Sequence, residues 1–263
     1  MPILSSITPL LLTFNEAPNI GRALERLTWA QEILVVDSFS TDETLHIVKS
    51  FPQVRVLQRK FDDHTTQWNF GLEAVGSRWV LTLDADYVLP KEFLDELHRL
   101  PLNGEISAFF ASFRYCIGGK PLRACLYPPR AVLFRKDKCH YSNDGHTQLL
   151  EIAGKCDWLR TSILHDDRKP LDRWLSEQNK YAVLEASHLL QTPREQLNFH
   201  DRLRRRIVLA PVLVFFYTLL GKGLILDGWP GWYYVFQRTL AETLLSLRLL
   251  EGRFHGTTGQ QDH

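Results

Sequence analysis

Short apolar runs alternate with amphipathic segments along the first third of the chain. The strands predicted from these runs are Ile7 to Phe14, Glu32 to Val36, Val54 to Leu57 and Trp79 to Leu83. Apolar runs of this length are typical of strands that are covered on both faces. Alternation of such strands with helical segments predicts βαβ units, and therefore a mostly parallel sheet with right-handed crossovers.

The segments between these runs carry helix-start signals. Pro18 stands where a first helical turn accepts proline, ahead of apolar residues at helical spacing from Ile20 to Leu27. Ser40-Thr41-Asp42-Glu43 has the pattern of a capping box, in which Ser40 accepts from the backbone N–H of Glu43 and Glu43 reaches back. A helix should follow directly, and another is predicted over Thr65 to Val75.

The pattern changes after Pro90. Gly118-Gly119 indicates a turn at the end of a strand. A long segment near residue 180 has apolar residues on one helical face and polar residues on the other. The predicted elements are a helix over Lys91 to Leu100, strands at Ile106 to Tyr115, Ala131 to Phe134 and Trp158 to Leu164, and a helix over Pro170 to Leu190.

The C-terminal region contains two apolar stretches. Ile207 to Leu220 is fourteen residues without a charge, too short for a spanning helix, and Leu224 to Phe236 is rich in Trp and Tyr. Apolar and aromatic helices beside arginines predict a helical region that lies in the interface of an anionic membrane. The alternative is a buried helical hairpin packed on the domain or on a second subunit of a homo-oligomer. The arginines are Arg202, Arg204, Arg205 and Arg206.

Composition limits the partners and the compartment. With 31 Lys plus Arg against 30 Asp plus Glu, the net charge of +1 gives no reason to expect nucleic acid as a partner. No secretory signal peptide is recognised and the cysteines lack Cys-x-x-Cys spacing, so we expect buried thiols in a reducing compartment. The predicted location is cytoplasmic, peripheral on the inner face of the cell membrane. The cysteines are Cys116, Cys125, Cys139 and Cys156.

Two carboxylates end the fourth predicted strand. Asp84 and Asp86 follow the apolar run at the carboxyl edge of the sheet, where open α/β sheets bind ligands. Mg²⁺ or Mn²⁺ held by one or two carboxylates keeps open positions for substrate phosphates. This pair therefore predicts a divalent metal site, although a polar loop after a strand has the same pattern.

Polar residues also end the first two predicted strands. Thr13-Phe14-Asn15-Glu16 and Asp37-Ser38 should lie at the same edge as Asp84 and Asp86. Donors and acceptors at the first two strand ends can bind a nucleobase and its ribose, while a metal at the fourth holds a diphosphate. The order and spacing of these groups predict a nucleotide site.

In this order the motifs resemble those of the family 2 glycosyltransferases. The resemblance is closest to the bacterial branch that builds lipopolysaccharide cores and surface glycans, and it covers nearly the whole chain. It implies a GT-A fold, a nucleoside-diphosphate sugar donor, a divalent metal (Mg²⁺ or Mn²⁺), and inverting transfer to a glycan or lipid-linked acceptor. The motifs are Thr13 to Glu16, Glu32 to Asp42, Gln67 to Leu72 and Leu83 to Asp86, with His165 and Leu226-Asp227-Gly228 further along.

The resemblance also implies roles for individual residues. Asp84 would face ribose or metal, and Asp86 and His165 would ligate the metal. His165 has the alternative of bonding to backbone. Apart from the resemblance, Arg168 is predicted to pair with the diphosphate because its planar fork suits phosphate oxygens, with an ion pair to a neighbouring aspartate as the alternative. The residues implied to line the nucleotide-sugar pocket are Thr13, Asn15, Glu16, Asp37, Ser38, Gln67 and Asn69.

Two positions depart from the family pattern; the first concerns one phosphate contact and the second the choice of base. Trp68 precedes Asn69 where the family often has a basic residue, and Gln148 stands where the branch has a glutamate. Because glutamine cannot accept a proton as a base, another carboxylate must take the proton of the acceptor hydroxyl. Asp144, beside a glycine in a polar segment, is the candidate, and Glu151 is the reserve.

The resulting interpretation is an α/β protein with a C-terminal helical region. We assign residues 1–192 to a glycosyltransferase domain, 193–255 to the helical region and 256–263 to a disordered tail. Within the domain, residues 1–100 form the nucleotide-sugar half and residues 101–192 the acceptor half. Two alternatives stay open: a non-catalytic sugar-nucleotide-binding module at the membrane, and a haloacid-dehalogenase-like phosphatase, in which the first aspartate of Asp-x-Asp is a nucleophile.

Overall fold

The computed structural model describes residues 3–102, 104–143 and 148–258. Contacts divide the chain into two compact units. The sheet unit comprises Met1–Pro121 and Leu126–Arg168, and the helical unit comprises Leu122–Cys125 and Lys169–His263. The sequence placed its division at residue 192, whereas the contacts divide after Arg168, because the long helix that follows packs within the helical unit.

Among the described residues, seven strands form the central sheet, in the order β12-β6-β9-β4-β1-β2-β3. Pairing is parallel except at β9, which runs antiparallel to both β4 and β6. The predicted mostly parallel sheet is therefore confirmed. The strands are β1 (Ile7–Thr13), β2 (Ile33–Asp37), β3 (Val54–Gln58), β4 (Trp79–Asp84), β6 (Ile106–Ala111), β9 (Arg130–Arg135) and β12 (Lys155–Trp158).

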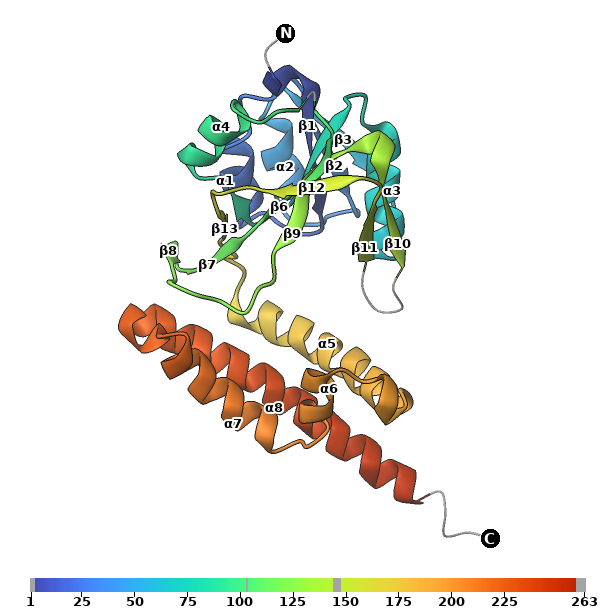
Figure 1. Cartoon of the computed structure of the whole chain (residues 1–263), viewed down its shortest axis with the longest axis vertical. Helices are drawn as coiled ribbons and strands as arrows, with labels where there is room; N and C mark the ends of the chain where they lie inside the picture. Colours follow the sequence, from blue (N-terminus) through green and yellow to red (C-terminus); the bar gives the residue numbers. More distant parts are fainter. Residues whose placement is uncertain (1–2, 103, 144–147, 259–263) are drawn as a thin grey trace. The chain divides into compact units, whose positions relative to one another are not determined.

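Side chains along each central strand alternate between two cores because successive residues point to opposite faces of a sheet. Leu11 and Val35 belong to one core, and Leu10 and Val36 to the other. Helices cover both faces (Figure 1). On the first face lie α1 (Ile20–Glu25), α2 (Thr44–Lys49) and α4 (Lys91–Leu97), and on the second lie α3 (His64–Ala74) and the hairpin of β10 (Cys139–Asn143) and β11 (Gln148–Ile152).

Helix α3 approaches the sheet closely at Gly71. A Cβ atom built there would lie 2.7 Å from a methyl group of Leu10 and 3.2 Å from one of Val36. Because such contacts are too short for a side chain, glycine allows the helix to pack directly on β1 and β2. The segment Gln67 to Leu72 thus has a packing role in addition to the role implied for it in binding.

Several local predictions are corrected by the structure. The capping box is wrong: helix α2 begins at Thr44, its N-cap Glu43 makes no side-chain cap bond, and Ser40 bonds to Asp37 instead. Pro18 lies in a turn before α1 rather than in its first helical turn. The strands predicted at Ile106 to Tyr115 and Trp158 to Leu164 are each two strands, because the chain leaves the central sheet partway along.

A second sheet takes up the strands that leave the first. Its order is β5-β13-β7-β8, with β13 antiparallel to β5 and parallel to β7. In this register His165 lies opposite Tyr87, one residue after Asp86. The strands are β5 (Tyr87–Val88), β7 (Phe113–Ile117), β8 (Lys120–Pro121) and β13 (Ile163–His165).

The helical unit is built on α5 (Leu171–Gln191) and α8 (Trp229–Thr258). Ala186 and Leu189 of α5 pack against Leu245 and Leu249 of α8. Among the described residues, no helix combines the length and the apolar character needed to cross a bilayer. The remaining helical segments are η3 (Arg194–Gln196), α6 (Phe199–Arg204), α7 (Leu209–Phe216), the π-helical turn η4 (Tyr217–Gly221) and η5 (Leu224–Asp227).

The four cysteines are free thiols. Cys116 and Cys139 are buried, and burial raises the pKa of the Cys116 thiol to about 11 and that of Cys139 to about 12. Cys125 is half-buried and Cys156 is exposed, so the expectation of buried thiols holds for two of the four.

Candidate active site

The ends of β1 and β2 are joined by a buried polar contact. The Thr13 hydroxyl donates to the Asp37 carboxylate at 3.0 Å, and both residues are buried. Asp37 also accepts from the backbone N–H of Ser40 at 2.9 Å and from Gln58 Nε2 at 3.3 Å. A carboxylate that accepts this many hydrogen bonds is fixed in position, so the Asp37 side chain is held in one orientation at this sheet edge.

The loop after β1 is held against the loop after β2. Asn15 has a φ of 55°, in the left-handed region, and its Oδ1 accepts from the backbone N–H of Thr41 at 2.8 Å. Its own N–H donates to Ser40 Oγ at 2.8 Å. The N–H of Glu16 donates to Thr44 Oγ1 at 2.7 Å. Backbone held in a sparsely populated conformation by several contacts is common at binding sites.

Gln67 and Asn69 of α3 are both engaged within the sheet unit. Gln67 is buried, donates to Ser38 Oγ at 3.0 Å and accepts from Arg59 Nη1 at 2.8 Å. Asn69 donates to the Tyr141 carbonyl at 2.8 Å and accepts from its N–H at 3.0 Å. Asn69 therefore fixes β10 to α3, and its role in donor binding stays a prediction.

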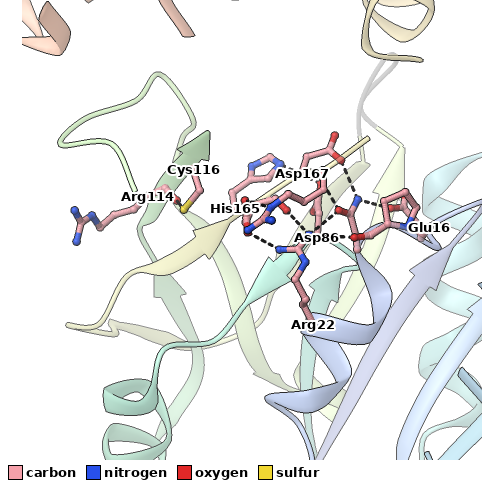
Figure 2. Close-up of polar contacts among 11 residues, drawn as sticks. Glu16, Arg22, Asp86, Arg114, Cys116, His165 and Asp167 are labelled. Carbon is pink, nitrogen blue, oxygen red and sulfur yellow. Dashed lines mark hydrogen bonds and ion pairs between the residues drawn. The ribbon is translucent and has the colours of Figure 1, made fainter. Parts of the chain in front are cut away.

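Asp84 ends β4, Asp86 comes two residues later, and the surroundings of the two side chains differ. The Asp84 side chain is 42 % exposed, and Arg130 Nη1 lies 3.9 Å from its Oδ2. Asp86 is buried, and its Oδ2 lies 3.2 Å from His165 Nε2. Figure 2 shows Asp86 and His165 together at this edge. The structure thus joins Asp86 to His165, whereas Asp84, two residues before Asp86, faces Arg130.

His165 is enclosed by aromatic rings. The rings of Tyr87, Tyr115 and Tyr127 lie with their centroids 4.8 to 5.2 Å from the imidazole. Burial opposes the charged imidazolium, but the charge and hydrogen bond of Asp86 outweigh it, so the pKa of His165 is raised above its ordinary value. The partner of Nε2 is a carboxylate, not backbone. Its Nδ1 is buried and has no hydrogen-bond partner among the described residues.

Asp84, Asp86 and His165 offer ligand types that a divalent metal accepts. The described residues nevertheless contain no group of three or more His, Cys, Asp or Glu side chains placed to hold a metal ion. Two carboxylates and an imidazole with a buried, unbonded nitrogen at one sheet edge supply the oxygen and nitrogen ligands that suit Mn²⁺ or Mg²⁺. Substrate phosphates would complete the shell.

A polar network ties the segment after β13 to α1. Arg22 forms an ion pair with Asp166 and donates to its carbonyl at 2.9 Å, and Asn19 Nδ2 donates to Asp167 at 2.8 Å. The N–H of Asp166 donates to the Asp86 carbonyl at 3.0 Å. In Figure 2, Arg22 reaches from α1 toward this segment, whereas Arg114 points away. The network holds the backbone that carries His165.

Arg168 forms an ion pair with a neighbouring aspartate, Asp166, which was the alternative to pairing with a diphosphate. Its Nη2 lies 2.9 Å from Asp166 Oδ2, and its N–H donates to Asn19 at 2.8 Å. The side chain remains 42 % exposed. Pairing with a donor diphosphate stays a prediction for this residue.

Sequence reasoning missed Arg130 and Tyr127. Arg130 begins β9, and its guanidinium lies 4.8 Å from the ring centroid of Tyr127. The Tyr127 hydroxyl is 2.5 Å from that of Tyr87. The only sequence signal was an arginine before a predicted strand, and its place opposite Asp84 depends on the antiparallel pairing of β9 with β4.

The candidate base lies outside the described residues. Asp144 follows Asn143, the last residue of β10, and precedes Gln148, the first of β11. The reserve, Glu151, is exposed on β11, and its Oε2 lies 3.2 Å from His140 Nε2. Its neighbours Leu150 and Ile152 pack on the core, so Glu151 points to the opposite face of the hairpin.

Comparisons with known proteins agree on one family. Residues 10–155 match the model of Glycosyl transferase family 2. The chain is 26 % identical over 242 residues, 86 % of it and 84 % of the relative, to the lipopolysaccharide core biosynthesis glycosyltransferase LpsC of Rhizobium meliloti. It is 33 % identical over 211 residues, 74 % of it and 72 % of the relative, to an uncharacterized glycosyltransferase, RT0209, of Rickettsia typhi.

A solved structure shares the fold. The crystal structure of S. aureus TarS 1–349 in complex with UDP-GlcNAc superposes with a TM-score of 0.50 at 15 % sequence identity. The match covers 96 % of this chain and 92 % of that one.

Proposed function

The chain belongs to glycosyl transferase family 2 and has the GT-A fold, and on that premise we propose that it is an inverting, metal-dependent enzyme that uses a nucleoside-diphosphate sugar. The observation that carries the proposal is that two pairs of polar side chains lie at the same edge of the sheet. Thr13 and Asp37 end β1 and β2, and Asp84 and Asp86 follow at the end of the neighbouring strand β4. This arrangement suits a nucleoside on one side and a metal-bound diphosphate on the other.

The proposed acceptor is a lipopolysaccharide core or a related lipid-linked glycan. The support is the name of the relative LpsC, which the chain matches over most of its length. Family membership also removes the phosphatase interpretation, in which Asp84 would be a nucleophile, since a glycosyltransferase of this type forms no phosphoenzyme.

The chain's own residues define the chemical step. The acceptor oxygen attacks the anomeric carbon, the bond from that carbon to the diphosphate oxygen breaks, and Asp144 takes the acceptor proton. Asp84, Asp86 and His165 would hold the metal ion; the N–H of Asp166 holds the backbone carbonyl of Asp86, and His165 contacts its carboxylate. When bound, that ion supplies positive charge that stabilises the leaving diphosphate.

A transfer assay tests this proposal. Purified protein is incubated with Mn²⁺, a panel of nucleoside-diphosphate sugars, and lipopolysaccharide core as acceptor, while release of nucleoside diphosphate is measured. We expect release with at least one donor, increased by acceptor and lost with EDTA. Release that EDTA leaves unchanged would contradict metal dependence. If nucleoside-diphosphate sugars raise the melting temperature of the protein but none of them is turned over, the result would support the non-catalytic binding module instead.

We further propose that the helical unit binds the inner face of the cell membrane. Exposed apolar side chains on α7 and η4 recur every three or four residues, so they form one stripe along the helix. A second stripe lies on α8, beginning with Trp229, which is 81 % exposed. We call these together the apolar stripes: Val208, Leu209, Val212, Leu213, Phe216, Tyr217 and Leu220 on the first, and Trp229, Tyr233, Phe236, Leu240 and Leu247 on the second.

The arginines contribute less to this surface than the sequence indicated. Arg204 forms ion pairs with Glu185 and Glu242 inside the helical unit. Arg205 donates to the carbonyls of Leu189 and Thr192 at the end of α5. The stripes themselves, which include Tyr217 on the first and Trp229 and Tyr233 on the second, therefore carry the proposal, because helices with this pattern lie in the interface plane.

A vesicle-sedimentation experiment tests the membrane proposal. The double variant Phe216→Ser, Trp229→Ser removes one large side chain from each stripe. Since a buried aromatic side chain contributes about 1.5–3 kcal/mol, partition to vesicles with anionic lipid should fall at least about tenfold. The matched control Tyr181→Ser, Leu184→Ser changes two exposed apolar residues of α5 and should bind as the wild type does. Unchanged vesicle binding by the stripe variant would contradict the membrane proposal. A wild-type protein that forms a dimer and does not bind vesicles would favour packing of the helical region on a second subunit.

A further inference from the structure

Arg130 is placed beside the proposed metal site without being fixed to it. Its Nη1 lies 3.9 Å from Asp84 Oδ2, beyond hydrogen-bond distance, and the two side chains are 44 % and 42 % exposed. An ion pair of this length at a half-exposed position contributes little to stability. The contact can therefore break when another partner enters.

Among the described residues, the Arg130 guanidinium packs on an aromatic ring and donates no hydrogen bond to an acceptor. It lies 4.8 Å from the centroid of Tyr127, and stacking on an aromatic face leaves the N–H groups of an arginine available. Those N–H groups form a planar fork that suits phosphate oxygens. The N–H groups of Arg130 thus remain able to donate to a ligand, while its positive charge offsets the negative charge of Asp84 at 3.9 Å.

The ring beneath Arg130 is itself held firmly. The Tyr127 hydroxyl lies 2.5 Å from the Tyr87 hydroxyl, and its ring packs edge-on against Phe113 and His165 at 5.0 and 4.9 Å. Burial raises the pKa of Tyr127, so the phenol stays neutral. The Arg130 guanidinium can therefore shift across the Tyr127 ring while that ring stays in place. The same ring contacts the proposed metal ligand His165.

We propose that Arg130 is an exchangeable counter-ion of Asp84. Without ligand it neutralises the Asp84 carboxylate, and when a divalent cation and a diphosphate occupy the site the guanidinium moves to the diphosphate oxygens. This inference rests on the proposed function, because it requires both ligands at the same sheet edge. It predicts opposite effects of one substitution: Arg130 competes with the cation for Asp84 but attracts the diphosphate.

Two binding constants of the full-length protein test the exchange. Mn²⁺ alone is titrated by electron paramagnetic resonance, and inorganic pyrophosphate is titrated calorimetrically at saturating Mn²⁺. In Arg130→Gln, removal of the competing positive charge should tighten Mn²⁺ binding about three- to tenfold, while pyrophosphate binding should weaken about tenfold. Arg130→Lys keeps the charge but loses the planar fork, so it should bind Mn²⁺ as the wild type does and pyrophosphate more weakly.

A control on the same strand separates this effect from a general change of charge. Arg135 ends β9 and pairs with Asp137, so Arg135→Gln should leave both constants unchanged. If the Mn²⁺ and pyrophosphate binding constants of Arg130→Gln change in the same direction, or equal those of the wild type, the proposed exchange of Arg130 between Asp84 and the diphosphate is wrong. The proposed metal site is unaffected by that result. A wild-type protein that binds neither Mn²⁺ nor pyrophosphate overturns the metal site and the exchange together.

Discussion

Asp86→Ala is expected to lower sugar transfer by about a thousandfold or more and to abolish Mn²⁺ binding. Asp86 is the buried carboxylate of the proposed metal site, and it is also the partner of His165 Nε2. Its removal takes away one ligand and the hydrogen bond that orients a second, so the developing charge on the diphosphate loses its stabilisation. Transfer rates and Mn²⁺ titrations on the purified variant measure both effects.

Two further variants make this result specific. Asp86→Asn keeps the size of the side chain and one oxygen, so it should stay folded, as judged by circular dichroism, and still lose at least about a hundredfold in rate. Asp95→Ala removes an exposed carboxylate from α4 and should have wild-type activity. Near wild-type transfer by Asp86→Ala would show that the carboxylates after β4 hold no catalytic metal.

Asp144→Asn is expected to lower kcat by about a hundred- to ten-thousandfold while donor affinity stays nearly unchanged. An amide cannot take the proton of the acceptor hydroxyl, but it keeps the size of the carboxylic acid. The proposed donor site includes Thr13 and Asp37, which belong to other elements, β1 and β2. Single-turnover rates report the chemical step, and a donor titration reports the affinity.

The matched control is Glu151→Gln in the same hairpin. Glu151 is exposed and pairs with His140, so its amide variant should retain most of the activity. Full activity in Asp144→Asn together with a large loss in Glu151→Gln would assign the proton transfer to Glu151 instead.

Much of the sheet unit was predictable because its central strands β1, β2 and β4 are buried on both faces. Continuous apolar runs mark such strands, and the parallel order follows from their alternation with helices. Placing Thr13, Asp37 and Asp84 at one edge then needed only the rule that parallel strands end at the same side. These residues do end β1, β2 and β4, which are adjacent in the sheet.

Local chain signals were less reliable where tertiary contacts compete with them. Ser40 fits a capping box in sequence, but in the structure it bonds to Asp37 and accepts from the backbone of Asn15. A hydroxyl beside a buried carboxylate stabilises that carboxylate, and this contact replaces the weaker cap bond. The boundary of α2 moved accordingly to Thr44.

Sequence alone determined the order of the strands along the chain, the family and the residue types at the strand ends, because hydrophobic periodicity and motif spacing are local properties. Only the tertiary structure decided which distant groups meet. His165 reaches Asp86 through the pairing of β13 with β5, and Arg130 faces Asp84 through the antiparallel β9. Such contacts depend on strand register across long loops, and no local pattern encodes that register.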